Sequence, residues 1–340
     1  MKATLKDVAA EAGVTVTTVS RVLNNRGPIS EKTRRKVYDA INKLDYRPNE
    51  AARSLGKKRT NVIGVIVPSI ANPFFSELVN HLEAYAFSKG YHIELCNSYH
   101  EEYKEKEYLS LLQENRVAGI IISSRTEDIG KYLTDRLPVV SFERIINETT
   151  AAVTCDNYEG GKLATEHLLH CGCKHLAAFQ IKSGVPMSAD KRIDAFRDTC
   201  KANGIEFKIF QATESQFQSM RFQDFSMEIL KKQKGIDGFF IPGDVAAIQF
   251  ITACQKCGIR VPDEIQVVGF DDISMATWVH PQLTTIHQPI EQMSKVAVNT
   301  IIDFDPNSFI PLRSVIPVSL IERESTKKND MILINHSKKY

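Results

Sequence analysis

Apolar residues recur at helical spacing from the start of the chain. Four of them occupy positions i, i+3, i+4 and i+7, namely Leu5, Val8, Ala9 and Ala12. This spacing predicts an amphipathic helix with a single buried face. Thr4 and Asp7 have the residue types and the separation of a capping pair at the start of that helix, and Gly13 can adopt the positive φ that ends it.

A second short helix is predicted directly after this glycine, with Thr15 as its N-terminal cap. Its inner face carries Val19, Val22 and Leu23. Its other positions are mostly short and polar, with one apolar residue on the flank: Val16, Thr17, Ser20, Arg21 and Asn24. Two short helices joined at a glycine have the spacing of a helix-turn-helix, which inserts its second helix into the major groove of DNA. An ordinary solvated helix face would look the same, so this pattern alone leaves both interpretations open.

The distribution of charge favours the DNA-binding interpretation. Residues 1–60 contain 14 lysines and arginines and 6 aspartates and glutamates, a net charge of +8, although the whole chain carries only +2. The remaining residues are therefore acidic, with a net charge of −6. A basic head displaces counterions from nucleic acid, and an acidic body limits non-specific adhesion to the same polyanion. A membrane-surface helix would need large apolar residues opposite its charges, and here those positions are small.

Two further helices are predicted before residue 60. Ser30 can cap a third helix whose apolar positions again follow helical spacing: Val37, Ala40, Ile41 and Leu44. Arg47 and Pro48 end that helix. Asn49 is a suitable cap for a fourth helix, Glu50–Leu55, which is too short to be stable alone and should form only against a partner or DNA. A flexible linker between domains is the alternative interpretation of this segment.

From residue 61 the pattern changes to short, continuous apolar runs that alternate with helical stretches. The runs are VIGVIVP, YHIELCN, AGIIISS, PVVSFE, AAVTCD, HLAAFQ, GFFIPG and QVVGFD. Alternation of this kind predicts βαβ units and parallel sheets that are buried on both faces. No apolar segment approaches the roughly 20 residues needed to cross a membrane, and the chain begins with the basic head rather than a secretory signal. We therefore expect a cytoplasmic, nucleoid-associated protein.

Seven cysteines raise the question of a metal site. The richest segments are His170–His175, with sequence HCGCKH, and Cys254–Cys257, with sequence CQKC. Neither spacing completes the ligand set of a zinc site, so we expect free thiols in a reducing compartment, and neither a metal nor another cofactor. The chain also lacks a nucleophile elbow, a P-loop and an HExxH motif, and no catalysis is expected.

Three consecutive segments carry a resemblance to a known family. DVAAEAGVTVTTVSRVLN at 7–24, SEKTRRKVYDAINKLDYRPN at 30–49 and EAARSLGKK at 50–58 closely resemble the head of LacI/GalR (lactose-repressor/galactose-repressor) transcriptional regulators of the sugar-responsive branch. The match continues through most of the chain, whose body resembles the periplasmic sugar-binding fold. The resemblance implies an all-α helix-turn-helix head and an α/β two-lobed, periplasmic-binding-protein-like body with parallel sheets.

The resemblance also implies an organisation in four parts. These are a DNA-binding domain at 1–48, a hinge helix and linker at 49–60, an effector-binding and dimerisation domain at 61–325, and a C-terminal tail at 326–340. Within the body, lobe one is expected at about 61–157 plus 288–318, and lobe two at about 158–287 plus 319–325. The chain would then cross between the lobes three times.

In the resembled family the second helix reads bases and paired hinge helices enter the minor groove. Matching positions assign base readout chiefly to Val16, Thr17 and Arg21, because a guanidinium can contact guanine bidentately and an apolar side chain suits a thymine methyl group. Leu55 would wedge between base pairs and kink the operator, and Lys57 would contact phosphate. Further phosphate contacts are assigned to Thr4, Thr15, Thr18, Ser20, Asn24, Asn25 and Thr33.

Separated positions in the body match the pocket pattern of sugar-binding relatives. They are Asn72, Phe74, Phe75, Glu143, Arg144, Arg192, Phe217, Asp244, Asp271 and Gln288. In such a pocket aromatic rings cover the C–H faces of a sugar, while carboxylate, guanidinium and amide groups bind its hydroxyls. Glu143 stands where aspartate is common and Gly243 where asparagine is frequent. Both departures are consistent with a ligand larger or differently hydroxylated than ribose.

Two other features of the body have more than one interpretation. Asp156 and Asn157, at the first expected crossing, are better explained as a strand end and helix start than as a sensor of lobe closure. Trp278, the only tryptophan, either covers the mouth of the pocket or packs as a surface anchor.

Together these features predict a ligand-responsive, sequence-specific DNA-binding repressor. A small sugar, ribose-like or a disaccharide such as sucrose, would release it from double-stranded operator DNA, and the expected assembly is a homodimer or a higher oligomer. The alternative is a regulator whose co-repressor is a purine or a phosphoprotein, because HPQLTTIHQP also resembles the purine-repressor branch. A sugar receptor without DNA function would require a signal peptide, and the sequence shows none.

Overall fold

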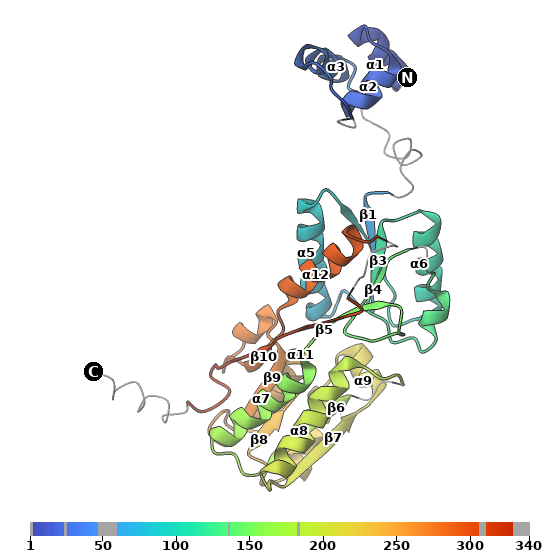
Figure 1. Cartoon of the computed structure of the whole chain (residues 1–340). Coiled ribbons are helices and arrows are strands. Elements are labelled where there is room, and N and C mark those ends of the chain that lie inside the picture. The colour runs from blue at the N-terminus through green and yellow to red at the C-terminus, as the bar shows by residue number, and fades with distance from the viewer. Residues whose placement is uncertain are drawn as a thin grey trace, which may run out of the picture. The chain divides into compact units, whose positions relative to one another are not determined.

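The computed structural model describes residues 3–23, 26–46, 60–134, 137–181, 184–305 and 311–328. The chain forms two compact units, Met1–Thr60 and Asn61–Tyr340 (Figure 1). The predicted hinge helix and the roles assigned to Asn24, Asn25, Leu55 and Lys57 lie outside the described residues. Among the residues described, no helix has both the length and the apolar character needed to cross a membrane.

The described part of the first unit contains three helices: α1 (Leu5–Ala12), α2 (Val16–Leu23) and α3 (Glu31–Lys43). Their buried faces meet in one small core, made of Val8, Ala9, Ala12, Val19, Val22, Val37 and Ala40. Leu5, Leu23, Ile41 and Leu44 are partly buried and pack around this core. The helical spacing of the apolar residues therefore predicted the packing of this unit correctly.

Local hydrogen bonds fix where these helices begin and end. Thr4 and Asp7 form the predicted capping box, and Gly13 ends α1 with φ of 65°. The hydroxyl of Thr15 accepts a hydrogen bond from the backbone N–H of Thr18 at 3.2 Å. The Ser30 hydroxyl accepts one from the N–H of Thr33 at 3.3 Å. Each cap satisfies a backbone donor that the helix itself leaves unpaired.

Two six-stranded sheets organise the second unit. The sheet of lobe one runs in the order β11-β5-β4-β3-β1-β2, and all its neighbours are parallel. Its strands are β1 (Val62–Val67), β2 (His92–Asn97), β3 (Gly119–Ile122), β4 (Val139–Phe142), β5 (Ala151–Cys155) and β11 (Arg313–Ile316). Strands β3 and β5 are buried at every position, as expected for a parallel sheet with both faces covered.

The sheet of lobe two runs in the order β12-β10-β9-β8-β6-β7. Its strands are β6 (Leu176–Ile181), β7 (Phe207–Ala212), β8 (Gly238–Phe240), β9 (Gln266–Asp271), β10 (Thr284–His287) and β12 (Ser319–Ile321). Strand β12 pairs with β10 antiparallel, an exception to the predicted parallel pattern. All eight predicted runs form strands, whereas β7, β10, β11 and β12 were not predicted. Strands β7, β11 and β12 lie at sheet edges with half-exposed positions, so they lack a continuous apolar run.

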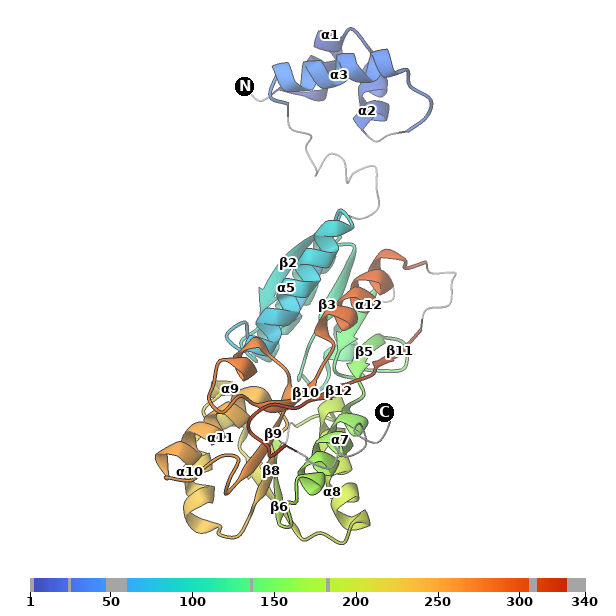
Figure 2. The same ribbon diagram turned by 90° about the vertical axis from the view of Figure 1, so that its left-hand side faces the viewer.

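Helices cover both sheets (Figure 2). They are α5 (Pro73–Ser88), α6 (Glu102–Glu114), α7 (Asn157–His170), α8 (Lys191–Ala202), α9 (Glu214–Ser219), α10 (Gln223–Lys232), α11 (Asp244–Lys256) and α12 (Ile290–Ile302), with short 3-10 turns η1 (Ile129–Tyr132), η2 (Ser188–Asp190) and η3 (Ser274–Thr277). In lobe one, α5 and α12 pack side by side. In lobe two, α7 and α8 form one layer and α10 and α11 the other, with the sheet between them.

The chain passes between the two sheets at three places. It leaves the first sheet after β5, returns to lobe one after β10, and crosses again between β11 and β12. The carboxyl ends of β4 and β5 in lobe one and of β9 in lobe two lead into this junction. In open parallel sheets, ligands bind outside the carboxyl ends of the strands, so the topology points to the lobe junction as a binding site.

Helices α7 and α8 approach each other most closely at Gly161. A Cβ atom built on Gly161 would lie 2.2 Å from the carbonyl oxygen of Arg192, well inside van der Waals contact. Only glycine therefore allows this helix pair to pack as observed, and the contact sets the position of the backbone that carries Arg192.

Replacing Gly161 by alanine should destabilise the body by about 1 to 3 kcal/mol, because the methyl group forces the two helices apart. In an unconstrained helix the same change would stabilise by up to about 1 kcal/mol. The midpoint of urea unfolding, followed by circular dichroism, shows whether the substitution lowers or raises the stability of the body. Lys162→Ala, at an exposed neighbouring position, is the control and should shift the midpoint little. An unchanged or raised midpoint for Gly161→Ala would contradict the packing described.

Candidate functional site

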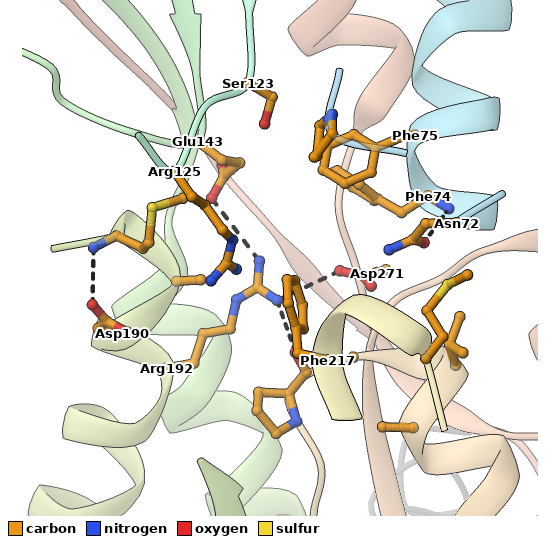
Figure 3. Close-up of a pocket in the computed structure, with 18 of the residues that line it drawn as sticks. Asn72, Phe74, Phe75, Ser123, Arg125, Glu143, Asp190, Arg192, Phe217 and Asp271 are labelled. Atoms are coloured by element: carbon orange, nitrogen blue, oxygen red, sulfur yellow. Dashed lines mark hydrogen bonds and ion pairs between the residues drawn. The ribbon is translucent and has the colours of Figure 1, made fainter. Parts of the chain in front are cut away.

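A pocket opens between the lobes of the body and takes its lining from both (Figure 3). Lobe one contributes Pro68, Asn72, Phe74, Phe75, Ser123, Arg125 and Glu143. Lobe two contributes Gln180, Met187, Ala189, Asp190, Arg192, Ile193, Phe217, Met220, Phe222, Pro242, Gly243, Val245, Ala246 and Asp271, and Gln288 lies at the second crossing. Eight of the ten effector-binding residues predicted from the sequence are therefore brought together in one pocket.

Arg192, near the start of α8, is at the centre of the polar contacts. Its Nε donates to Oδ1 of Asn157 at 2.6 Å, and its Nη1 donates to the carbonyl oxygen of Pro242 at 3.1 Å. Nη1 also lies 3.5 Å from Oδ1 of Asp271, and Nη2 lies 4.0 Å from Oε2 of Glu143. The guanidinium sits 3.6 Å above the centre of the Phe270 ring. A buried cation with these partners is fixed in one orientation.

Glu143 joins the two lobes through its carboxylate. It follows β4 with φ of 59°, and its Oε1 accepts a hydrogen bond from the backbone N–H of Cys155 at 2.5 Å. Its Oε2 accepts from Nδ2 of Asn157 at 2.8 Å. Asn157 is the first residue of α7, on which the chain enters lobe two, so this hydrogen bond joins lobe one to the beginning of lobe two.

Asn157 belongs to this network, although it was not among the site residues predicted from the sequence. Asp156 does cap α7, because its carboxylate accepts from the N–H of Glu159 at 3.0 Å, so the structural interpretation is correct for that residue. The side chain of Asn157, however, bonds both Glu143 and Arg192 and is almost fully buried. The only signal was an amide directly after a strand at a crossing, which is also a common helix start.

Asp271, at the end of β9, is buried beside two donors. Its Oδ1 accepts from Nε2 of Gln288 at 2.6 Å and faces Arg192. Burial raises the pKa of Asp271 to about 6, and the neighbouring Arg192 limits the rise. The Oε1 of Gln288 is buried without a hydrogen-bond partner among the described residues, so an acceptor is available beside the pocket.

Aromatic side chains form the apolar part of the lining. The rings of Phe74 and Phe75, in the first turn of α5, meet edge to face with centroids 5.2 Å apart. Asn72 caps this helix through Oδ1, which accepts from the N–H of Phe74 at 3.1 Å, and its amide nitrogen points toward the pocket in Figure 3. Phe217, on α9, supplies a ring from lobe two. Rings beside polar groups suit a ligand with both C–H and O–H faces.

Two predicted effector-binding residues do not line the pocket. The guanidinium of Arg144 donates instead to three carbonyl oxygens of the loop after β3, at 3.1, 2.7 and 3.2 Å. Asp244, at the start of α11, is fully buried beneath the pocket, and its oxygens accept from the N–H of Ile273 at 3.0 Å and the hydroxyl of Thr285 at 2.6 Å. The structure therefore does not bring these two residues into the pocket lining, because hydrogen bonds to other parts of the chain already use both charged groups.

The remaining candidates of the body take structural or exposed positions. Trp278 is 75% exposed and does not line the pocket. In this structure it therefore neither covers the mouth of the pocket nor packs as a surface anchor. Cys171 and Cys173 contact the carbonyl oxygens of Lys327 and Asp237 through sulfur. Within the described ranges, no three histidine, cysteine or acidic side chains gather to hold a metal ion.

The helix-turn-helix presents its predicted readout residues at the surface. Val16 is 40% exposed, and Thr17 and Arg21 are exposed on α2. Several hydroxyls assigned to phosphate instead bond within the head: Thr15 with Thr18 at 2.9 Å, Ser30 with Thr33 at 2.8 Å, and Thr4 with Asp7 at 2.7 Å. These side chains cap the starts of the three helices.

The fold and the site define a class of protein. A three-helix head with an exposed second helix and a positive net charge is built for duplex DNA. A two-lobed body with a polar pocket between its sheets is built for a small polar molecule. The chain therefore combines DNA binding and small-molecule binding.

Comparisons with known proteins identify the family. The family model "Bacterial regulatory proteins, lacI family" matches residues 4–49, and the model "Periplasmic binding protein-like domain" matches residues 165–326. The sucrose operon repressor of Pediococcus pentosaceus is 36% identical over 324 residues, covering 95% of this chain and 99% of the relative. The ribose operon repressor of Halalkalibacterium halodurans is 36% identical over 325 residues, covering 95% of this chain and 97% of the relative.

A solved structure gives the same result. The lac repressor dimer bound to operator and the anti-inducer ONPF matches with a TM-score of 0.83 and 26% identity, covering 96% of this chain and all of that one. The chain belongs to the lacI family of bacterial regulatory proteins. The resemblance and the fold class predicted from the sequence are confirmed, and the protein is a DNA-binding transcriptional regulator.

Substitutions on the exposed face of α2 should change which operator is preferred. Thr17→Ala and Val16→Ala should each alter the preferred bases by about 1 to 3 kcal/mol at one position, because both side chains are exposed on the helix predicted to read bases. Selection of binding sites from a random DNA library measures the preference. Lys6→Ala, an exposed basic change on α1, is the control and should leave the preferred site unchanged. The same selected site for wild type and both α2 variants would refute the readout assignment.

The raised pKa of Asp271 predicts a pH dependence of stability. Its folded-state pKa of about 6 exceeds its ordinary value of 3.8, so the folded state binds the proton more tightly than the unfolded chain. Stability contributed by this proton is present at low pH and is lost as pH rises from about 4 to about 6. Relative to Asp271→Asn, the wild type should therefore lose about 1 to 2 kcal/mol between pH 4.5 and pH 7 in urea unfolding. A pH-independent difference between the two proteins would contradict this assignment.

Proposed function

We propose that the chain is a transcriptional repressor that leaves its operator when a small sugar binds between the lobes of the body. The observation that carries the proposal is the set of charged groups Glu143, Arg192 and Asp271 in the wall of the pocket, with Asn157 bonded to two of them. Guanidinium, carboxylate and amide groups held in fixed orientations can each bind a pair of sugar hydroxyls. The Phe74, Phe75 and Phe217 rings exclude water beside them.

Relatives support a carbohydrate as the effector. The two curated relatives described above are named as sucrose and ribose operon repressors, and both align along nearly the whole chain. The pocket also has free space at Gly243, where a Cβ would come no closer than 3.9 Å to Asp271. A residue without a side chain at this position leaves room for a ligand that extends beyond one small ring.

The contacts between the lobes suggest how occupancy reaches the head. Glu143 of lobe one and Asn157 at the start of lobe two share a hydrogen bond, and both neighbour Arg192 in the pocket. A ligand that bonds Arg192 or Glu143 competes with or reinforces this bond, and so favours one arrangement of the lobes. Two chains paired through their bodies would then move their hinge segments together or apart. We therefore propose a homodimer, as in the lac repressor dimer.

We propose no catalytic role for the pocket. Its candidate acids and bases, Glu143 and Asp271, are held in ion pairs with Arg192 rather than beside an unengaged nucleophile. A purine or phosphoprotein co-repressor is the less favoured alternative, because the pocket lining combines paired carboxylates with phenyl rings rather than a flat apolar slot. We propose that the protein acts on DNA in the cytoplasm.

A thermal-shift screen of sugars and purines tests the effector class, because a ligand that binds only the folded body raises its melting temperature. A sugar should raise this temperature and release operator DNA in a mobility-shift assay. Arg192→Ala should weaken sugar binding by at least about 100-fold, or about 3 kcal/mol, and leave operator affinity unchanged.

Two further variants make this experiment decisive. Lys201→Ala, at an exposed position near the end of α8, is the control and should respond as the wild type does. Asp271→Asn keeps the shape of its side chain and removes the charge, so it tests the network if Arg192→Ala unfolds. A normal sugar response from both pocket variants, or a shift with purines alone, would refute the proposed effector site.

A further inference from the structure

A second arginine faces the pocket without a carboxylate partner. Arg125, in the loop after β3, is half-buried and lines the pocket from lobe one. Its guanidinium lies 4.0 Å above the centre of the Phe217 ring, which belongs to α9 of lobe two. Among the residues that the structure describes, no acceptor lies within hydrogen-bonding distance of this guanidinium and no carboxylate pairs with it.

Dedicated contacts hold the loop that presents Arg125. On one side, the buried carboxylate of Glu105 accepts hydrogen bonds from the hydroxyls of Ser124 and Ser98. On the other side, Arg144 donates to the carbonyl oxygens of Ser124, Thr126 and Glu127. Residues on both sides of Arg125 are therefore fixed by buried charged groups. This loop is built to keep the guanidinium at the pocket wall.

No carboxylate among the described residues forms an ion pair with Arg125, although Asp190 and Glu214 lie near enough for their charges to raise its pKa. Glu143 and Asp271 face Arg192 instead. Asp190 lies on the same side of the pocket, but its carboxylate accepts a hydrogen bond from the N–H of Met187 at 2.9 Å and does not form an ion pair with Arg125. Burial lowers the pKa of Arg125 to about 10, which still leaves the group charged at neutral pH. A half-buried, unpaired cation of this kind costs stability.

We propose that the effector is an acidic sugar whose oxyanion, a phosphate ester or a carboxylate, pairs with Arg125. This inference rests on the proposed function. The stacked guanidinium keeps its N–H edge available, and that edge matches the oxygen geometry of either anion. The Arg192 network would bind the hydroxyls at the other end of the ligand. Because Arg125 and Phe217 belong to different lobes, an anion at this position would bind across the pocket and hold the lobes together.

This assignment predicts opposite effects of one substitution on stability and on binding. Arg125→Gln removes a poorly solvated charge, so the free protein should melt at the same temperature or higher. The same change should weaken binding of the acidic sugar about 10- to 100-fold, and binding of its neutral parent less than about threefold. Arg125→Lys keeps the charge but not the planar fork, and it should recover only part of the affinity.

Matched ligands test the proposal with the full-length protein. Isothermal calorimetry compares ribose with ribose 5-phosphate, fructose with fructose 6-phosphate, sucrose with sucrose 6-phosphate, and glucose with gluconate. In the wild type, at least one acidic member should bind 10-fold or more tightly than its neutral parent, and added salt should reduce the difference. The phosphate and carboxylate pairs distinguish the two sources of the anion. Arg260→Gln, beyond the distant end of α11, is the control and should change nothing.

The outcomes separate the two proposals. The inference about Arg125 is wrong if neutral sugars bind as tightly as acidic ones and release the operator. It is also wrong if Arg125→Gln keeps the preference for acidic sugars. In both cases the proposal of a sugar-responsive repressor stands. If no sugar of either class binds the body or releases the operator, the proposed function is wrong and the inference fails with it. The wild-type ligand comparison needs no variant, so a folding defect in Arg125→Gln would not leave the question open.

Discussion

The buried ion pairs of Arg192 are the interaction on which the organisation of the body depends. Its partners come from four separate segments: the end of β4, the start of α7, the residue before Gly243, and the end of β9. Taking one cation and two carboxylates out of water is costly unless each finds its partner, and removing one partner from such a set typically costs 3–5 kcal/mol. The network therefore forms only when both sheets are folded and joined.

The same network also explains how one pocket can bind a ligand and link two lobes. Glu143 and Asn157 bond across the first crossing, and Gln288 at the second crossing bonds Asp271. The ligand-facing groups are thus also the groups that connect the lobes at two of the three crossings. A ligand cannot contact them without changing the balance of those bonds, which is the physical requirement for coupling binding to conformation.

Charged residues in this body divide into those that face the ligand and those that support a loop. Arg144 and Glu105 form hydrogen bonds with the loop around Arg125. Asp244 accepts a hydrogen bond from the backbone of Ile273, outside the pocket lining. Arg192 and Arg125 instead direct their charge into the cavity wall. The head divides its hydroxyls in a similar way, because Thr4, Thr15 and Thr33 hold helix starts while Thr17 stays exposed. In both units, one residue holds a loop or a helix start while a nearby residue of the same type is available to a ligand or to DNA.

The sequence by itself determined the elements whose signals are local. Helical spacing predicted the core of the head, capping residues predicted its helix starts, and apolar runs predicted eight of the strands of the body. Family resemblance located eight of the residues that line the pocket, among them Asn72 and Gln288. Only the tertiary structure decided that Arg144 and Asp244 lie outside the pocket lining, that Arg125 belongs to it, and that Asn157 holds Glu143 and Arg192 in place. The role of a charged side chain depends on which acceptors the folded chain brings within about 3 Å, and those come from segments distant in the sequence.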